Sequence, residues 1–171
     1  MSCKFVRALA VAAALLFAGA AQAETTVIAR AGVWQAFAGT ANDGTKLCGI
    51  STTWPDERYF GLKFYKGDKT FTIQMGSPKW KIDDGAKQTV AMQIDANGTW
   101  KGTATGMHFG DKTAGLEFEI VEAQLSQFVE EFAHGETLYL SFPNANVDDW
   151  QASLDGTPTL IRTFISCIEA M

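Results

Sequence analysis

The sequence predicts a mainly β protein, an antiparallel β-sandwich or open barrel of about eight strands with two short α-helices. Apolar and polar residues alternate through most of the chain, as they do in strands that bury one face. Several alternating segments are joined by short turns that contain Gly, Asp or Asn, which indicates antiparallel hairpins. There is no repeated strand-helix-strand unit, so a parallel doubly wound sheet is not expected.

The amino terminus has the three regions of a secretory signal. Lys4 and Arg7 precede an apolar stretch, which ends in the small-residue triplet Ala21-Gln22-Ala23. The apolar stretch is shorter than the roughly 20 residues that a membrane-spanning helix needs. We therefore predict that residues 1–23 are a signal peptide cleaved after Ala23, and that residues 24–171 are a single exported domain.

Net charge and the predicted export limit the partners that this domain can have. The chain has 14 Lys and Arg and 19 Asp and Glu residues, and loss of Lys4 and Arg7 leaves 12 basic residues against 19 acidic ones, a formal charge of −7. Nucleic acid is not expected as a partner, because binding to phosphates needs a basic surface, and the same argument disfavours anionic lipid. We expect a periplasmic or secreted protein without a transmembrane segment in its mature chain.

The first half of the domain contains two single strands and a hairpin. Strands are predicted at 27–37 and 47–53. The hairpin pairs 59–65 with 69–75 across the polar turn Lys66-Gly67-Asp68. In both of its strands the apolar residues fall on one face.

The second half continues this alternation. A second hairpin pairs 90–94 with 99–105 across the turn 95–98, and strands follow at 115–121 and 136–142. Five of these strands, all except 99–105 and the two single strands, have apolar residues that we expect to face the core. They are Phe60, Leu62, Phe64, Phe71, Ile73, Met75, Val90, Met92, Ile94, Leu116, Phe118, Ile120, Leu138, Leu140 and Phe142.

Two segments have the helical period instead. Between residues 122 and 134 the apolar residues recur at i, i+3, i+4 and i+7, and Gly135 follows as a helix stop. Near the carboxyl terminus, Thr157 is the predicted N-cap and Pro158 the first residue of a helix that packs inward.

Two cysteines remain after cleavage, Cys48 and Cys167. An even number in an exported chain predicts a disulfide, which would tie the last helix to the strand that carries Cys48. In the chain-entropy model, closing so long a loop stabilises the fold by about 4 to 5 kcal/mol. A redox pair or a zinc site is disfavoured, because there is no C-x-x-C motif and the two histidines lie far apart in the sequence.

Familiar catalytic motifs are absent: the sequence has no G-x-S-x-G, H-E-x-x-H, P-loop or G-x-G-x-x-G pattern. His108 and Asp111 could act as a base and its orienting carboxylate. A polar turn between two strands explains them better, because no nucleophile lies nearby in the sequence. His134 is explained by its favourable place at the end of a helix.

Several acidic residues offer oxygen ligands for calcium, namely Asp83-Asp84, Asp148-Asp149, and Asp95 with Asn97. None of them has the spacing of a calcium loop, and Asp and Asn are common in turns for backbone reasons. We therefore predict neither a metal nor a cofactor.

The best candidates for binding are Trp54 and Trp80, with Lys79 and Lys81 on either side of the second tryptophan. Both tryptophans fall at the ends of predicted strands, outside the alternating core face. Exposed tryptophans beside charges are found where proteins bind partners or rings. The alternative is that the two indoles plug the end of the barrel or sandwich.

The order of features resembles the invasion-associated locus B family of exported proteobacterial proteins. The shared features run from Trp34 and the cysteine after it, through the hairpin 60–75, to the run 76–85 that leads into a strand ending in Ile94-Asp95. They continue with Leu125-Ser126-Gln127-Phe128, Gly135-Glu136-Thr137 and Leu154-Asp155-Gly156. This chain departs from the family at Phe37, where family members commonly carry a cysteine.

The resemblance implies a non-enzymatic β protein of the envelope, associated in some bacteria with invasion, and offers no catalytic residues to transfer. Three functions remain open. The first is an interaction protein that binds an envelope or host protein, the second a small-molecule carrier with an internal cavity, and the third a hydrolase that uses His108. We rank them in this order.

Overall fold

A computed structural model of the chain describes residues 24–109, 113–143 and 147–171. The predicted signal peptide, residues 1–23, and Asp111 lie outside the described residues. No helix in the described part of the chain is long and apolar enough to cross a membrane.

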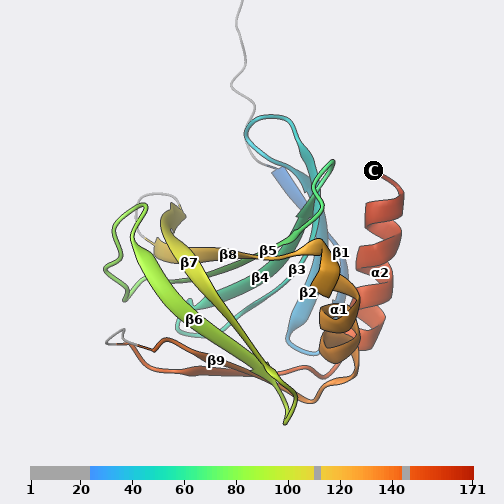
Figure 1. Ribbon diagram of the computed structural model, residues 1–171. Coiled ribbons are helices and arrows are strands. Elements are labelled where there is room, and N and C mark those ends of the chain that lie inside the picture. The colour runs from blue at the N-terminus through green and yellow to red at the C-terminus, as the bar shows by residue number, and fades with distance from the viewer. Residues whose placement is uncertain (1–23, 110–112, 144–146) are drawn as a thin grey trace, which may run out of the picture.

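Ten strands of the described chain form one antiparallel sheet in the order β1-β2-β3-β4-β5-β8-β7-β6-β9-β10. Their bounds in chain order are β1 (Glu24–Ala31), β2 (Trp34–Thr40), β3 (Lys46–Thr53), β4 (Tyr59–Tyr65), β5 (Phe71–Ser77), β6 (Lys87–Ile94), β7 (Thr99–Phe109), β8 (Thr113–Ile120), β9 (Thr137–Ser141) and β10 (Trp150–Ser153). The sheet curls without closing, and both α-helices lie to one side of it (Figure 1). The predicted mainly β class is confirmed, and of the two predicted architectures the structure is the open barrel.

The inner face of the sheet is the face that alternation predicts. Fourteen of the fifteen residues expected to face the core are buried, and the other, Phe64, is half-buried and packs against the same core. Both predicted hairpins are present, with β4 paired to β5 and β6 paired to β7. The period of two therefore places each side chain correctly, because a shift of one residue would turn every apolar group toward water.

Two helices fill the concave side of this sheet. A short 3-10 turn, η1 (Glu122–Gln124), leads into α1 (Leu125–His134), and the chain ends in α2 (Thr157–Glu169), which packs against β1, β2 and β3. Phe128, Phe132 and Phe164 enter the core from the helices and are fully buried. The two predicted helices are confirmed.

The predicted N-cap of the last helix is wrong, because Gly156 occupies that position with φ 91°. The Thr157 hydroxyl donates instead to the carbonyl oxygens of Phe132 and Leu154, both at 2.8 Å. It thereby links the end of α1 to the start of α2. The residue type that suits a cap is used here to hold two helices together.

Two strand predictions also need correction. The segment 27–37 is not one strand but the hairpin of β1 and β2, which turns at Gly32 with φ 57°. A side chain at Gly32 would place its Cβ 2.5 Å from the carbonyl oxygen of Asp155, so the turn also needs glycine for close packing. The sequence did not reveal β10, because four residues are too few for a clear alternation.

Tryptophan side chains join the two ends of the curled sheet. In the sheet β10 has only β9 as a neighbour, so its other edge carries unpaired backbone groups. The Trp34 indole nitrogen donates to the carbonyl oxygen of Ser153 at 2.6 Å, and that of Trp54 donates to Gln151 at 3.2 Å. Indole N–H groups from the β2–β3 region therefore satisfy the edge that a further strand would otherwise pair.

Phe37, the point of departure from the resembling family, has a packing role on the convex face. It lies directly across from Gly49 in the register of β2 and β3. A Cβ on Gly49 would clash with the tip of the Phe37 ring, so the ring needs glycine opposite it, and the ring is itself buried. An aromatic residue and a glycine together form a packed pair at this position.

The predicted disulfide is present, since Cys48 in β3 and Cys167 in α2 are bonded across a sequence separation of 119. The Cα atoms lie 6.1 Å apart, within the usual range. The bond fixes the last helix against the first half of the sheet.

We expect a Cys48→Ala, Cys167→Ala variant to lose about 2 to 5 kcal/mol of its free energy of unfolding, because the unfolded chain gains the freedom that the bond removes. Urea unfolding of the mature protein measures this. Wild type with a reductant serves as the control and should unfold at the same lowered urea concentration. Equal midpoints for oxidised wild type and variant would contradict the expectation.

We expect Trp34→Phe to cost at least about 1 kcal/mol more than Trp80→Phe, because only the first substitution leaves a backbone carbonyl without its donor. Both changes remove the same atoms from a buried indole, and the Trp80 nitrogen has no acceptor among the described residues. Equal losses of the free energy of unfolding, measured in urea, would show that the hydrogen bond to Ser153 does not stabilise the fold.

Candidate ligand-binding site at the mouth of the barrel

Three of the connections between strands meet at one end of the barrel. Strands β3, β5 and β9 end there, and β4, β6 and β10 begin there, as the antiparallel order requires. We call this end the mouth. Trp54 follows β3, Trp80 lies three residues after β5, and Trp150 is the first residue of β10. The mouth thus brings together tryptophans from distant parts of the sequence.

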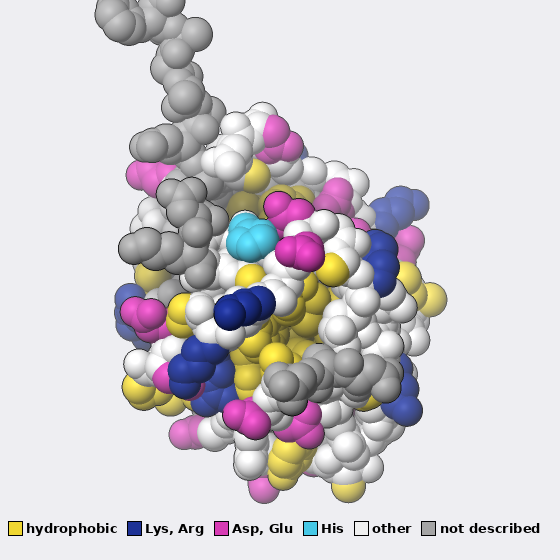
Figure 2. Space-filling view, turned by 90° about the vertical axis from the view of Figure 1, so that its left-hand side faces the viewer, with side chains coloured by type: hydrophobic (Ala, Val, Ile, Leu, Met, Phe, Trp, Pro, Cys, Tyr) yellow, Lys and Arg dark blue, Asp and Glu magenta, His cyan; other side chains and the backbone are white. Residues whose placement is uncertain are grey.

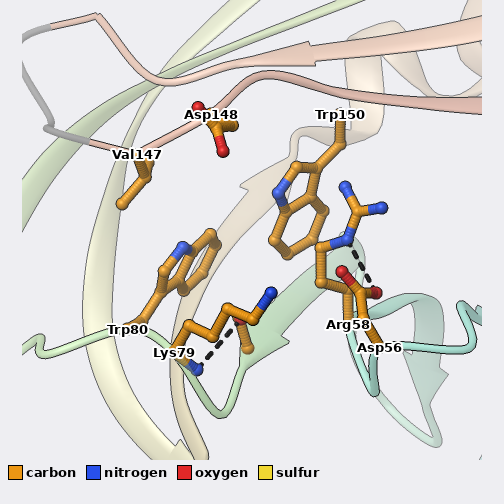
Figure 3. A pocket seen from close by; sticks show the side chains of 8 residues that line it. Asp56, Arg58, Lys79, Trp80, Val147, Asp148 and Trp150 are labelled. Atoms are coloured by element: carbon orange, nitrogen blue, oxygen red, sulfur yellow. Dashed lines mark hydrogen bonds and ion pairs between the residues drawn. The ribbon is translucent and has the colours of Figure 1, made fainter.

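A cavity of about 410 Å³ opens at the mouth (Figure 3). A second hollow of similar volume adjoins it and shares Lys79, Trp80 and Val147. Figure 2 looks onto this end and shows hydrophobic side chains at the bottom of a hollow, with basic side chains at its edge. The residues that line the first cavity are Asp56, Arg58, Ser77, Lys79, Trp80, Val147, Asp148 and Trp150.

The aromatic side chains of the mouth form one packed group. The rings of Trp80 and Trp150 are stacked, with centroids 4.8 Å apart and an angle of 18° between their planes. Phe142 meets both of them edge-on, at 5.2 and 5.3 Å. Trp80 is 8% exposed and Trp150 4%, and Trp54 is half-buried beside Trp150. The indoles therefore plug the end of the barrel, and only their edges line the cavity.

Arg58 lies between two of these indoles. Its guanidinium carbon is 5.2 Å from the ring centre of Trp54 and 5.4 Å from that of Trp150, within the range of a cation–π contact. Its Nε donates to Asp56 Oδ1 at 2.9 Å. This hydrogen bond holds the pKa of the Asp56 carboxyl below its ordinary value, because it favours the ionised form.

The segment between β5 and β6 carries Lys79 and Lys81, and both side chains are exposed. The backbone nitrogen of Lys79 donates to the Ser77 hydroxyl, which fixes the start of this segment. Neither ammonium group has an acceptor among the described residues. Three of the four predicted binding residues, Lys79, Trp80 and Lys81, therefore line the two hollows, while Trp54 supports Trp150 and Arg58.

His108 does not lie in a turn, as its sequence context suggested, but in β7. Its Nδ1 lies 2.7 Å from Asp84 Oδ1, and the two side chains are 41% and 74% exposed. The pair joins the β5–β6 segment to β7. Asp84 is a carboxylate partner that the sequence alone did not indicate, because the two residues are 24 positions apart.

The described acidic residues form no group of three or more that could hold a metal ion. Asp95 has another role, because its carboxylate accepts the backbone N–H groups of Glu136 and Thr137. Asp149 accepts the N–H of Phe142. These aspartates satisfy backbone donors at strand ends, as turn residues commonly do.

Sequence reasoning missed Arg58 and Trp150, and it considered Asp148 only as a calcium ligand and not as part of the mouth. A signal was present, since Trp150 follows Asp148-Asp149 much as Trp54 precedes Pro55-Asp56. Each is a tryptophan beside an aspartate at the end of a strand. Their meeting at one mouth depends on the curl of the sheet, which the sequence does not specify.

The fold and the mouth define this chain as an open antiparallel β-barrel with a disulfide-bonded terminal helix. No model of a protein family matches the sequence, and no curated protein does so. Among solved structures, the chain is similar to the crystal structure of invasion-associated protein B from Bartonella henselae, with a TM-score of 0.55 and 13% sequence identity. The match covers 86% of this chain and 99% of that one. The predicted resemblance is confirmed at the level of the fold.

We expect Arg58→Gln to raise the pKa of Asp56 toward 3.8, because the largest cause of its lowering is the Arg58 hydrogen bond. The lowered pKa means that the pair stabilises the folded state at neutral pH and loses this effect as the pH falls below 3.8 through the lower folded value. An NMR titration of the carboxyl carbons measures the shift.

Asp43 is the matched control for this titration. Its pKa is also lowered, but chiefly by the backbone N–H of Thr45. It should keep its value in the Arg58→Gln variant. A variant in which Asp56 titrates as in wild type would show that Arg58 does not hold this carboxylate.

Proposed function

We propose that the chain is a non-enzymatic protein of the bacterial envelope, periplasmic or secreted, that binds a partner protein through the mouth of its barrel. The signal pattern at residues 1–23 and the disulfide support export, because disulfides form in oxidising compartments. A protein of this fold is described as invasion-associated, and we extend the proposal to a role in invasion, with an envelope or host protein as the partner.

The observation that carries this proposal is the cavity at the mouth, in which buried indoles lie beside Arg58 and Lys79. Arg58 donates through Nε to Asp56, whereas the Lys79 ammonium has no acceptor among the described residues. Tryptophan and arginine are the residues most enriched at the centres of protein interfaces. Arg58 is already held between two indoles, so little of its conformational freedom remains to be lost on binding.

The two alternatives have less support. A carrier needs an internal cavity, but the concave side of the sheet is filled by Phe128, Phe132 and Phe164, each fully buried. A hydrolase using His108 needs a nucleophile beside the base, and the contact of His108 among the described residues is with Asp84. Both groups of that pair are well exposed to water.

A pull-down from the native envelope with crosslinking tests the proposal. The bait is the mature protein, either wild type or with Lys79→Glu and Lys81→Glu. We expect the variant to lose the captured partner, because it reverses two charges at the mouth. Charge variants are preferred to Trp80→Ala, since removal of a buried indole would leave a cavity and destabilise the fold.

The control bait carries Lys69→Glu and Lys101→Glu, which change the net charge equally at exposed positions outside the two hollows. It should capture the partner as well as wild type does. Equal capture by all three baits would place the interface elsewhere on the protein and overturn the proposal.

A further inference from the structure

Three of the five tryptophans of the chain use their indole N–H groups inside the protein. Trp34 and Trp54 donate to β10, and Trp100 donates to Glu131 Oε2 at 2.8 Å. Trp80 and Trp150 have no acceptor among the described residues. Figure 3 shows their nitrogens on the side of the rings that faces Val147 and Asp148. Within the described residues, the mouth therefore contains two indole donors without an acceptor, both on closely packed rings.

These rings offer edges and not faces. Trp80 is covered by Trp150 and Phe142, and Trp150 is covered by Trp80, Trp54 and Arg58. Their small exposed fractions leave no face free for a sugar ring or an aromatic ligand to stack on. The accessible chemistry of the two indoles is hydrogen-bond donation, and an indole N–H cannot accept.

The neighbouring cations add to this excess of donors. Arg58 uses only Nε for Asp56, and its two terminal nitrogens have no acceptor among the described residues. The same holds for the Lys79 ammonium, which lies on the cavity wall. Guanidinium and ammonium groups are also donors without acceptor capacity. A ligand that satisfies this set must supply several acceptor lone pairs at one place.

The acidic residues limit the charge of such a ligand. Asp56 and Asp148 line the same cavity as Arg58 and Lys79, so its formal charge is balanced before a ligand binds. A phosphate dianion would meet both carboxylates, whereas a single carboxylate brings one negative charge and two acceptor oxygens. The balance therefore disfavours a dianion more than a monoanion.

We propose that the mouth binds a carboxylate, held by the indole N–H groups of Trp80 and Trp150 and by the charges of Arg58 and Lys79. This inference rests on the proposed function and names the chemical group that the partner presents. The carboxylate belongs either to the end of a polypeptide chain or to an acidic side chain, and the experiment separates these two sources.

The experiment is an NMR titration of the mature protein with ¹⁵N-labelled tryptophan, in which Trp80→Phe and Trp150→Phe assign the two mouth signals. The probes are acetyl-glycyl-phenylalanine, its C-terminal amide, acetyl-aspartyl-phenylalanine amide and inorganic phosphate. We expect saturable shifts of the Trp80 and Trp150 indole signals with the first probe, and none with its amide. The signals of Trp34, Trp54 and Trp100 should stay in place, because their N–H groups are already used.

The third probe carries its carboxylate on a side chain, so saturation by it assigns the site to acidic side chains as well as chain ends. Lys79→Gln should weaken binding about tenfold, the loss expected for one hydrogen bond to a charged group. Lys69→Gln, at the opposite end of the barrel between β4 and β5, should leave it unchanged.

Equal shifts with acid and amide, tighter binding of phosphate, or no saturable shift with either carboxylate probe would each overturn the inference. These outcomes are distinct from failure of the proposed function. If the pull-down still depends on Lys79 and Lys81 while carboxylates do not bind, the mouth recognises its partner through another group. If carboxylates bind but the pull-down is unaffected, the mouth takes a small acid and the proposed protein interface fails.

Discussion

The structure depends on how the backbone groups at the free edge of β10, the last strand of the curled sheet, find hydrogen-bond partners. In place of a further strand, the indole N–H groups of Trp34 and Trp54 bind the free carbonyls of Ser153 and Gln151. These two bonds satisfy carbonyls on the edge of β10 that has no neighbouring strand, and they fix where β10 lies. The position of β10 in turn brings Trp150 against Trp80, which is how the cavity at the mouth acquires its wall. The contacts that hold β10 against the β2–β3 region therefore also build the site.

The disulfide and the helices secure this arrangement from the other side. Cys167 ties α2 to β3, and the Thr157 hydroxyl ties the start of α2 to the end of α1. The phenylalanines of both helices then fill the space that the curl of the sheet encloses. The interior is a packed core, and the hollows at the mouth lie at the surface of the protein.

Sequence patterns predict the strands well, because one buried face requires strict alternation in β4 to β9. They do not predict what the curl brings together. The hairpin at Gly32 was hidden, since β1 is an exposed edge strand whose residues show little alternation in burial. Of the site, Lys79, Trp80 and Lys81 were identified from local context, whereas Arg58 and Trp150 needed tertiary structure. The contact between Arg58 and Trp150 joins the β3–β4 connection to β10, and these strands are far apart in the strand order of the sheet.

The similarity to invasion-associated protein B separates what the fold requires from what the site requires. At 13% identity, two chains can share an open barrel, because apolar alternation, turns and helix packing can be met by many residues. A free indole N–H beside a cation is not required by any of these constraints. In this chain, three of five tryptophans donate to structural acceptors, and the other two have no acceptor in the part of the chain that the structure describes. Function should therefore follow the mouth residues rather than the fold, and a protein of this fold that lacks donors at the positions of Arg58, Trp80 and Trp150 should bind a different chemical group.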